Sequence, residues 1–176
     1  MDAALITIRP IVEADWREYR ALRLRMLEEI PLAFGETLAS AQRAQESIWR
    51  ARARRGESGN SVRFVAIDAA TGTWLGSMGG FLSPDDGNRP VLVGVYVIPG
   101  YRGTAAGVTD ALLAAVESWA HRFGDSLLLH VHEQNPRAIA AYAKRGFVPT
   151  GVTMPYPLDT SQTEIEMSKV LAAQLS

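Results

Sequence analysis

A run of small residues with one arginine lies between an apolar segment and a long amphipathic segment, and its composition suits an anionic ligand. The run is RGTAAG, Arg102 to Gly107. Small side chains let backbone N–H groups converge where a helix begins, and these unpaired amides together with the helix dipole favour anions. The run lacks the Gly-Lys-Ser/Thr ending of a P-loop and the spaced glycines of a dinucleotide fingerprint. A different phosphate-bearing ligand is expected, and an ordinary turn of small residues is the alternative.

A second stretch, NPRAIAAYAKRGF, adds a side chain that could transfer a proton. Asn135 before a proline is typical of a helix N-cap, and Gly146 is typical of a helix end. Tyr142 lies between them, and a phenol with an ordinary pKa of about 10 can protonate a leaving thiolate. The alternative for Tyr142 is aromatic packing on the apolar face of this helix, beside Phe147.

Two histidines and the absence of cysteine bear on metal and redox chemistry. His130 and His132 share one face of an expected strand, but the sequence offers no third ligand, so we expect no metal. The chain has no cysteine, which excludes disulfides, thiolate metal sites and a cysteine nucleophile.

The hydrophobic periodicity places these residues on a mixed set of elements. Helices are expected at 13–30, 38–55, 108–120 and 135–146. Strands are expected at 4–10, 62–68, 74–82, 91–98, 126–133, 147–154 and 163–171. The three central strands form an antiparallel meander. This order favours an α+β domain over a doubly wound α/β domain.

Length, composition and charge limit the class of protein. The 176 residues are 47% hydrophobic and suit one domain, residues 1–176. The net charge of −1 gives no electrostatic footprint for nucleic acid. No apolar run reaches membrane-spanning length, and the first ten residues are charged where a signal peptide is apolar. We therefore expect a cytoplasmic chain with neither nucleic acid nor membrane as partner.

Together the two motifs resemble the GCN5-related N-acetyltransferase (GNAT) superfamily. Val97-Ile98-Pro99 followed by the 102–107 run is similar to the pyrophosphate loop of that family, with Ala105 where glycine is usual. The family's Asn-x-x-Ala-x-x-x-Tyr-x-x-x-Gly-Phe pattern is matched over 135–147. The resemblance extends from about residue 62 to residue 171.

The resemblance implies a fold, a cosubstrate and a reaction. The fold is a mixed, mostly antiparallel sheet of about seven strands with about four helices, in which the fourth and fifth strands splay apart. Acetyl-CoA would donate an acetyl group to a primary amine of a small molecule by direct attack, with Tyr142 as general acid and no metal. The implied cofactor contacts are Val95, Tyr96, Val97, Arg102, Gly103, Thr104, Ala105, Ala106, Gly107, Val108, Asn135 and Ala138.

The first helices, which shape the acceptor site in this family, resemble the family only in general features. Phe34, Glu36, Tyr156 and Asp159 are expected to form a pocket with acidic walls for a cationic amine. A water relay is the expected route for the amine proton, and the alternative bases are Glu36, His130, His132 and Glu133.

Two other functions stay open on the sequence. One is a regulatory module that binds CoA without catalysis, and the other is an acetyltransferase acting on a protein or peptide. The chain is expected to be a monomer or a homodimer.

Overall fold

One continuous sheet organises the chain in the computed structural model, which describes residues 5–173. Its seven strands lie in the order β1-β2-β3-β4-β5-β7-β6. Only β4 and β5 are parallel neighbours, and all other pairs are antiparallel. The strands are β1 (Ile6–Pro10), β2 (Ser61–Asp68), β3 (Trp74–Ser83), β4 (Arg89–Val97), β5 (Ser126–His132), β6 (Val148–Tyr156) and β7 (Asp159–Val170). The predicted mixed, mostly antiparallel α+β sheet is confirmed.

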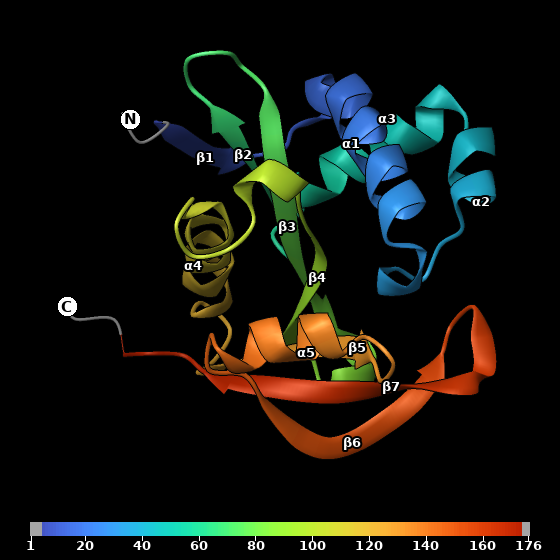
Figure 1. Cartoon of the computed structure of the whole chain (residues 1–176), viewed down its shortest axis with the longest axis vertical. Coiled ribbons are helices and arrows are strands. Elements are labelled where there is room, and N and C mark those ends of the chain that lie inside the picture. Colours follow the sequence, from blue (N-terminus) through green and yellow to red (C-terminus); the bar gives the residue numbers. More distant parts are fainter. Residues whose placement is uncertain (1–4, 174–176) are drawn as a thin grey trace.

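Helices cover both faces of the sheet, so two hydrophobic cores form. Figure 1 shows α1, α2 and α3 gathered on one side of β2–β4 and α4 on the other. Trp49 and Tyr19 lie in the core under α1 and α3, and Leu112 and Val116 lie in the core under α4. The helices are α1 (Trp16–Glu29), α2 (Leu38–Arg43), α3 (Glu46–Arg54), α4 (Val108–Ala120) and α5 (Pro136–Ala143).

The single helix expected over 38–55 is wrong, because the chain forms two helices there, which gives five α-helices among the described residues. The backbone is extended at Ala44 and Gln45, which separates α2 from α3. The indole N–H of Trp49 donates to the Ala44 carbonyl at 3.2 Å, so the interrupted backbone gains a hydrogen bond while the ring is fully buried. None of the helices in the described part of the chain combines the length and apolar character that a membrane span requires.

The last two strands are longer than expected and form a tight hairpin. The sequence placed strands at 147–154 and 163–171 with a loop between them, whereas β6 extends to Tyr156 and β7 begins at Asp159. Figure 1 shows this hairpin running across one end of the β3–β4 pair.

The strands β4 and β5 separate after a short parallel contact. Only Val91 with Leu128 and Leu92 with Leu129 are in register. One extra residue in β4 forms a bulge opposite β3, and Gly94 within it has a φ of 61°. A bulge bends the strand that carries it, so β4 leaves the direction of β5 at this point. The edge of β4 beyond Leu92 has no strand partner toward β5 among the described residues.

Candidate active site

A cavity of about 390 Å³ lies where β4 and β5 separate. It receives residues from both strands, from the turn after α1 and from α5, segments that are far apart in the sequence. Its walls include residues 91–95, 129–132 and 33–36, together with Arg23, Arg63, Phe81, Asn135, Ala138, Tyr142 and Glu164. Of the predicted site residues, the structure therefore brings Val95, Asn135, Ala138, Tyr142, Phe34 and Glu36 together around one space.

The loop before α4 has the backbone geometry of an open anion-binding turn. Gly103 and Gly107 have φ values of 90° and 71°, a region that favours glycine. Gly107 is the N-cap of α4 and offers no side-chain acceptor, so the first amides of the helix remain available. Residues 102–108 do not line the cavity between the strands, and a short 3-10 turn, Pro99–Tyr101, separates them from the end of β4.

Arg102 anchors this loop and does not reach into the cavity. Its Nε donates to the carbonyl oxygen of Val97 at 2.7 Å, and its guanidinium pairs with Glu29 of α1. Tyr96 points to the same side, where its hydroxyl donates to Glu29 at 2.5 Å. Burial and this hydrogen bond raise the pKa of Tyr96 to about 12. The structure thus places the side chains of Arg102 and Tyr96 in support of the loop, away from the space between the strands.

Asn135 and Tyr142 are fixed by α5. The Asn135 Oδ1 accepts from the backbone N–H of Ala138 at 3.2 Å, so this residue caps the helix. The Tyr142 ring packs edge-on against Phe147, with ring centroids 5.7 Å apart. No hydrogen bond joins the Tyr142 hydroxyl to another described residue, and desolvation raises the pKa of Tyr142 to about 12. Tyr142 thus lines the cavity with a phenol that is protonated at neutral pH.

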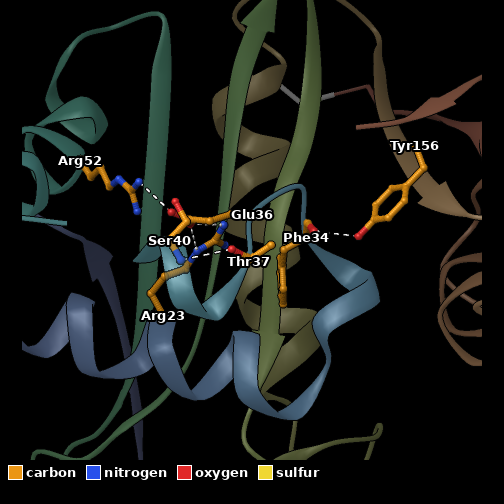
Figure 2. A network of polar contacts seen from close by, with 7 residues as sticks. All are labelled: Arg23, Phe34, Glu36, Thr37, Ser40, Arg52 and Tyr156. Carbon is orange, nitrogen blue, oxygen red and sulfur yellow. Dashed lines mark hydrogen bonds and ion pairs between the residues drawn. The ribbon is translucent and has the colours of Figure 1, made fainter. Parts of the chain in front are cut away.

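Glu36 lies between two arginines, as Figure 2 shows. Arg23 Nη2 lies 3.2 Å from one carboxylate oxygen, and Arg52 Nη2 lies 2.8 Å from the other. The Arg23 and Glu36 side chains are each only 15% exposed. The charge of Glu36 is thus compensated by two arginines, so this carboxylate does not provide the acidic wall that the sequence predicted.

The turn that carries Glu36 is held at both of its ends. Thr37 Oγ1 accepts from the Ser40 N–H at 3.1 Å and caps α2. The Tyr156 hydroxyl donates to the Phe34 carbonyl at 3.1 Å, which ties the β6–β7 hairpin to the turn (Figure 2). Asp159, by contrast, accepts from Ser161 and Gln162 and does not line the cavity.

Two of the expected bases, His132 and Glu133, are unsuited to accept a proton. His132 Nδ1 accepts from the Gln134 backbone N–H at 3.1 Å, so Nε2 carries the ring proton and donates to Gln162 at 2.6 Å. Both ring nitrogens are therefore occupied. Glu133 is exposed and lies outside the cavity lining.

The sequence analysis missed Glu164, a carboxylate on β7 that lines the cavity. Burial raises the pKa of Glu164, and the nearby histidines 130 and 132 lower it to a smaller extent. In the sequence, Glu164 alternates with Ile165, a pattern that predicts a solvent-facing side chain on a half-exposed strand. Because β7 pairs with β5, Glu164 lies opposite His132, and both residues line the cavity.

His130 also gains partners that the sequence did not reveal. Its Nε2 lies 3.8 Å from a carboxylate oxygen of Asp86 and 3.8 Å from one of Glu166, without a hydrogen bond. These three side chains offer ligand atoms within 4.8 Å of one another, a donor set that suits a cation.

The family of the chain follows from this fold and from the sequence. Residues 16–147 match the acetyltransferase (GNAT) family, and the chain belongs to this family. It is thus an acyltransferase by family, as the two motifs predicted. No curated protein matches the sequence at a significant level.

Solved structures share the fold along nearly the whole chain. yncA from Salmonella typhimurium, described with its cofactor acetyl-CoA, has a TM-score of 0.73 and 18% identity over 98% of this chain and 97% of its own. A ribosomal-protein-alanine N-acetyltransferase from Brucella melitensis has a TM-score of 0.73 and 24% identity, covering 94% and 99%. A spermidine N-acetyltransferase from Vibrio cholerae, in complex with CoA and spermine, has a TM-score of 0.69 and 17% identity, covering 94% and 95%. At such identities the likeness establishes the fold alone.

Proposed function

We propose that this protein transfers an acetyl group from acetyl-CoA to a primary amine of a small molecule. The observation that carries the proposal is the cavity between β4 and β5, which has an available phenol at one wall and an open helix N-terminus beyond its β4 edge. Neighbours of the same fold are described with acetyl-CoA or CoA bound. The cosubstrate supplies an activated acetyl thioester, and the residues of this chain bind it and move protons.

The backbone of the loop suits the pyrophosphate of the cosubstrate. The free amides at the start of α4 and the glycine geometry at Gly103 favour an anion there. The space beside Gly103 and Gly107 is open, because no atom lies within 4 Å of a Cβ added at either position. The pantetheine arm would follow the unpaired edge of β4, beside Val95, and reach Asn135 and Ala138 on the opposite wall.

Tyr142 is proposed to protonate the leaving sulfur. Its hydroxyl makes no hydrogen bond to another described residue, and a phenol is protonated at neutral pH, so a proton is available for the departing thiolate. With no cysteine in the chain, direct attack of the amine on the thioester is the simplest route.

Glu164 is proposed to take the proton from the amine, directly or through one water. Glu36 is held as a carboxylate by two arginines, whereas Glu164 lies in the cavity with a pKa raised by burial. A raised pKa makes a carboxylate a stronger base, which suits this role.

A small acceptor fits better than a protein chain, although the Brucella melitensis neighbour acts on a ribosomal protein. The bond between Tyr156 and the Phe34 carbonyl joins the hairpin to the turn beside the cavity, which narrows this side. A regulatory module without catalysis would have no use for an uncommitted phenol in the cavity.

A calorimetric titration with acetyl-CoA, using ATP and NAD as controls, tests the binding half of the proposal. Selective binding in the micromolar range, about −8 kcal/mol, is expected. Thiol release on mixing the loaded protein with a panel of amines tests the catalytic half. Binding without thiol release from any amine would favour the regulatory module, and equal binding of all three ligands would overturn the proposal.

A further inference from the structure

The Arg63 side chain extends from β2 past Gly79 and Gly94 toward the cavity. It stands on β2 opposite Gly79 of β3, and Gly79 in turn stands opposite Val93 of β4. A Cβ on Gly94 would lie 2.5 Å from the Arg63 Nη1, and a Cβ on Gly79 would lie 3.5 Å from its Cζ. The guanidinium thus occupies the space that side chains at these two positions would fill, and it ends beside the bulge in β4.

One terminal nitrogen of the Arg63 side chain is buried without a hydrogen-bond partner. Arg63 Nη1 is shielded from solvent and donates no hydrogen bond to any described residue, although the guanidinium also packs 5.3 Å from the Tyr19 ring centroid. A charged donor without an acceptor is costly in a protein interior, because it loses its hydration and gains nothing in return. None of the Arg63 guanidinium nitrogens bonds to another described residue, and Arg63 lines the cavity, so a ligand acceptor can reach the part of the guanidinium that borders this space.

The surroundings of Arg63 are positively charged. Burial and the neighbouring Arg63 lower the pKa of Arg23, while Tyr19 and Glu36 oppose this shift. Glu36 already forms ion pairs with both Arg23 and Arg52, as Figure 2 shows. A second cavity of about 490 Å³ shares Arg23, Arg63 and Glu36 with the first and is also lined by Arg52 and Arg55. Among its described lining residues, four arginines face a single carboxylate.

We propose that the acceptor amine carries a carboxylate, and that Arg63, assisted by Arg23, binds this carboxylate while the amine faces Glu164. This inference rests on the proposed acetyl transfer. A carboxylate would supply an acceptor for the Arg63 guanidinium, and it would offset the excess of positive charge in the second cavity, which shares Arg23 and Arg63 with the first. A cavity of about 390 Å³ has the size for an amino acid. A polyamine, which has no anionic group, would be repelled by the same arginines.

Matched acceptors isolate the contribution of the carboxylate. We would measure thiol release from acetyl-CoA with each amino acid, its amide and the amine that lacks the carboxylate, and with spermidine. Amino acids are expected to exceed their amides and amines in kcat/KM by at least about tenfold, the value of one hydrogen bond to a charged group. If the amides, simple amines or spermidine react equally well or better, or no amino acid reacts while acetyl-CoA binds, the inference is overturned. Failure of acetyl-CoA itself to bind would instead overturn the proposed function.

Substitutions at Arg63 test the residue itself. In Arg63→Gln, we expect KM for the preferred amino acid to rise about tenfold or more while acetyl-CoA affinity is unchanged, and the advantage over the amide to disappear. Arg50→Gln is the matched control, since Arg50 pairs with Glu46 on the surface and lines neither cavity. If Arg63→Gln does not fold, Arg63→Lys keeps the stem and the charge and should raise KM by a smaller factor. An unchanged KM in either folded variant, or equal loss with acid and amide, contradicts the role.

Discussion

The hydroxyl of Tyr142 is the proposed proton donor, and a substitution that removes only this group tests that role. Tyr142→Phe keeps the ring, and with it the edge-on contact to Phe147, but removes the proton. We expect kcat to fall by about 100-fold, a typical contribution of general acid catalysis, with little change in acetyl-CoA affinity. Stopped-flow thiol release and a calorimetric titration measure the two quantities separately. An unchanged kcat would show that Tyr142 serves packing alone.

Glu164 sets the pH dependence of the reaction if it is the base. Because its pKa is raised by burial, Glu164 holds its proton further toward neutral pH than an exposed glutamate does. The enzyme is then inactive below this pKa and gains activity as pH rises through it. In Glu164→Gln we expect a loss of about 100-fold in kcat near neutral pH and a flat acid limb.

The control for this experiment is Glu133→Gln, which removes an exposed carboxylate in the turn after β5, outside the cavity lining. Its pH profile should match that of the unaltered protein. An acid limb that persists in Glu164→Gln would assign the titration to another group and contradict the role of Glu164 as the base.

The bulge in β4 lies where this strand separates from β5, and it also brings Gly94 close to the Arg63 guanidinium. Gly94→Ala would combine a left-handed φ of 61° with a Cβ 2.5 Å from the Arg63 guanidinium. We expect the free energy of unfolding to fall by about 2 to 3 kcal/mol, through backbone strain and the displaced side chain together. Urea titration measures this loss, and acceptor KM should rise in parallel.

Gly72→Ala separates the two causes. Gly72 has a φ of 73°, and nothing lies within 4 Å of an added Cβ, so this variant tests backbone strain without the clash. We expect about 1 kcal/mol of destabilisation and no change in acceptor KM. Equal losses in the two variants would mean that Arg63 moves aside without cost.

Local sequence patterns predicted most of the elements but not the details of their ends. Periodicity in Val108, Leu112 and Val116 specified α4, and Asn135 specified the start of α5, because these signals lie within one turn of the feature that they determine. The helix α5 ends at Ala143, before the end at Gly146 that the sequence predicts. The break between α2 and α3 has no such signal. It depends on the hydrogen bond from the Trp49 indole to Ala44, which forms only when the ring is buried under α1.

For the whole molecule, the acceptor side could not be predicted because it depends on strand register. Arg63 meets Gly94 only through the pairing of β2 with β3 and of β3 with β4, and Glu164 enters the cavity only because β7 pairs with β5. The loop at 102–107, by contrast, is continuous in the sequence. The motif that implied the cosubstrate could therefore be recognised in the sequence, whereas the compensation of Glu36 by Arg23 and Arg52 could not.

The sheet also consists of two halves with little direct pairing between them, which has a consequence for stability. Two register pairs join β4 to β5, and beyond them the cavity separates the strands. A cosubstrate that binds there contacts both halves and only the folded state. At about 100 times its Kd, acetyl-CoA should raise the free energy of unfolding by about 2.7 kcal/mol, measured by urea titration. Amide hydrogen exchange should slow at residues 93–97 and 130–132, which border the gap, and should change little in β1. Protection confined to the start of α4 would mean that only the pyrophosphate is bound and that the strands stay apart without the rest of the ligand.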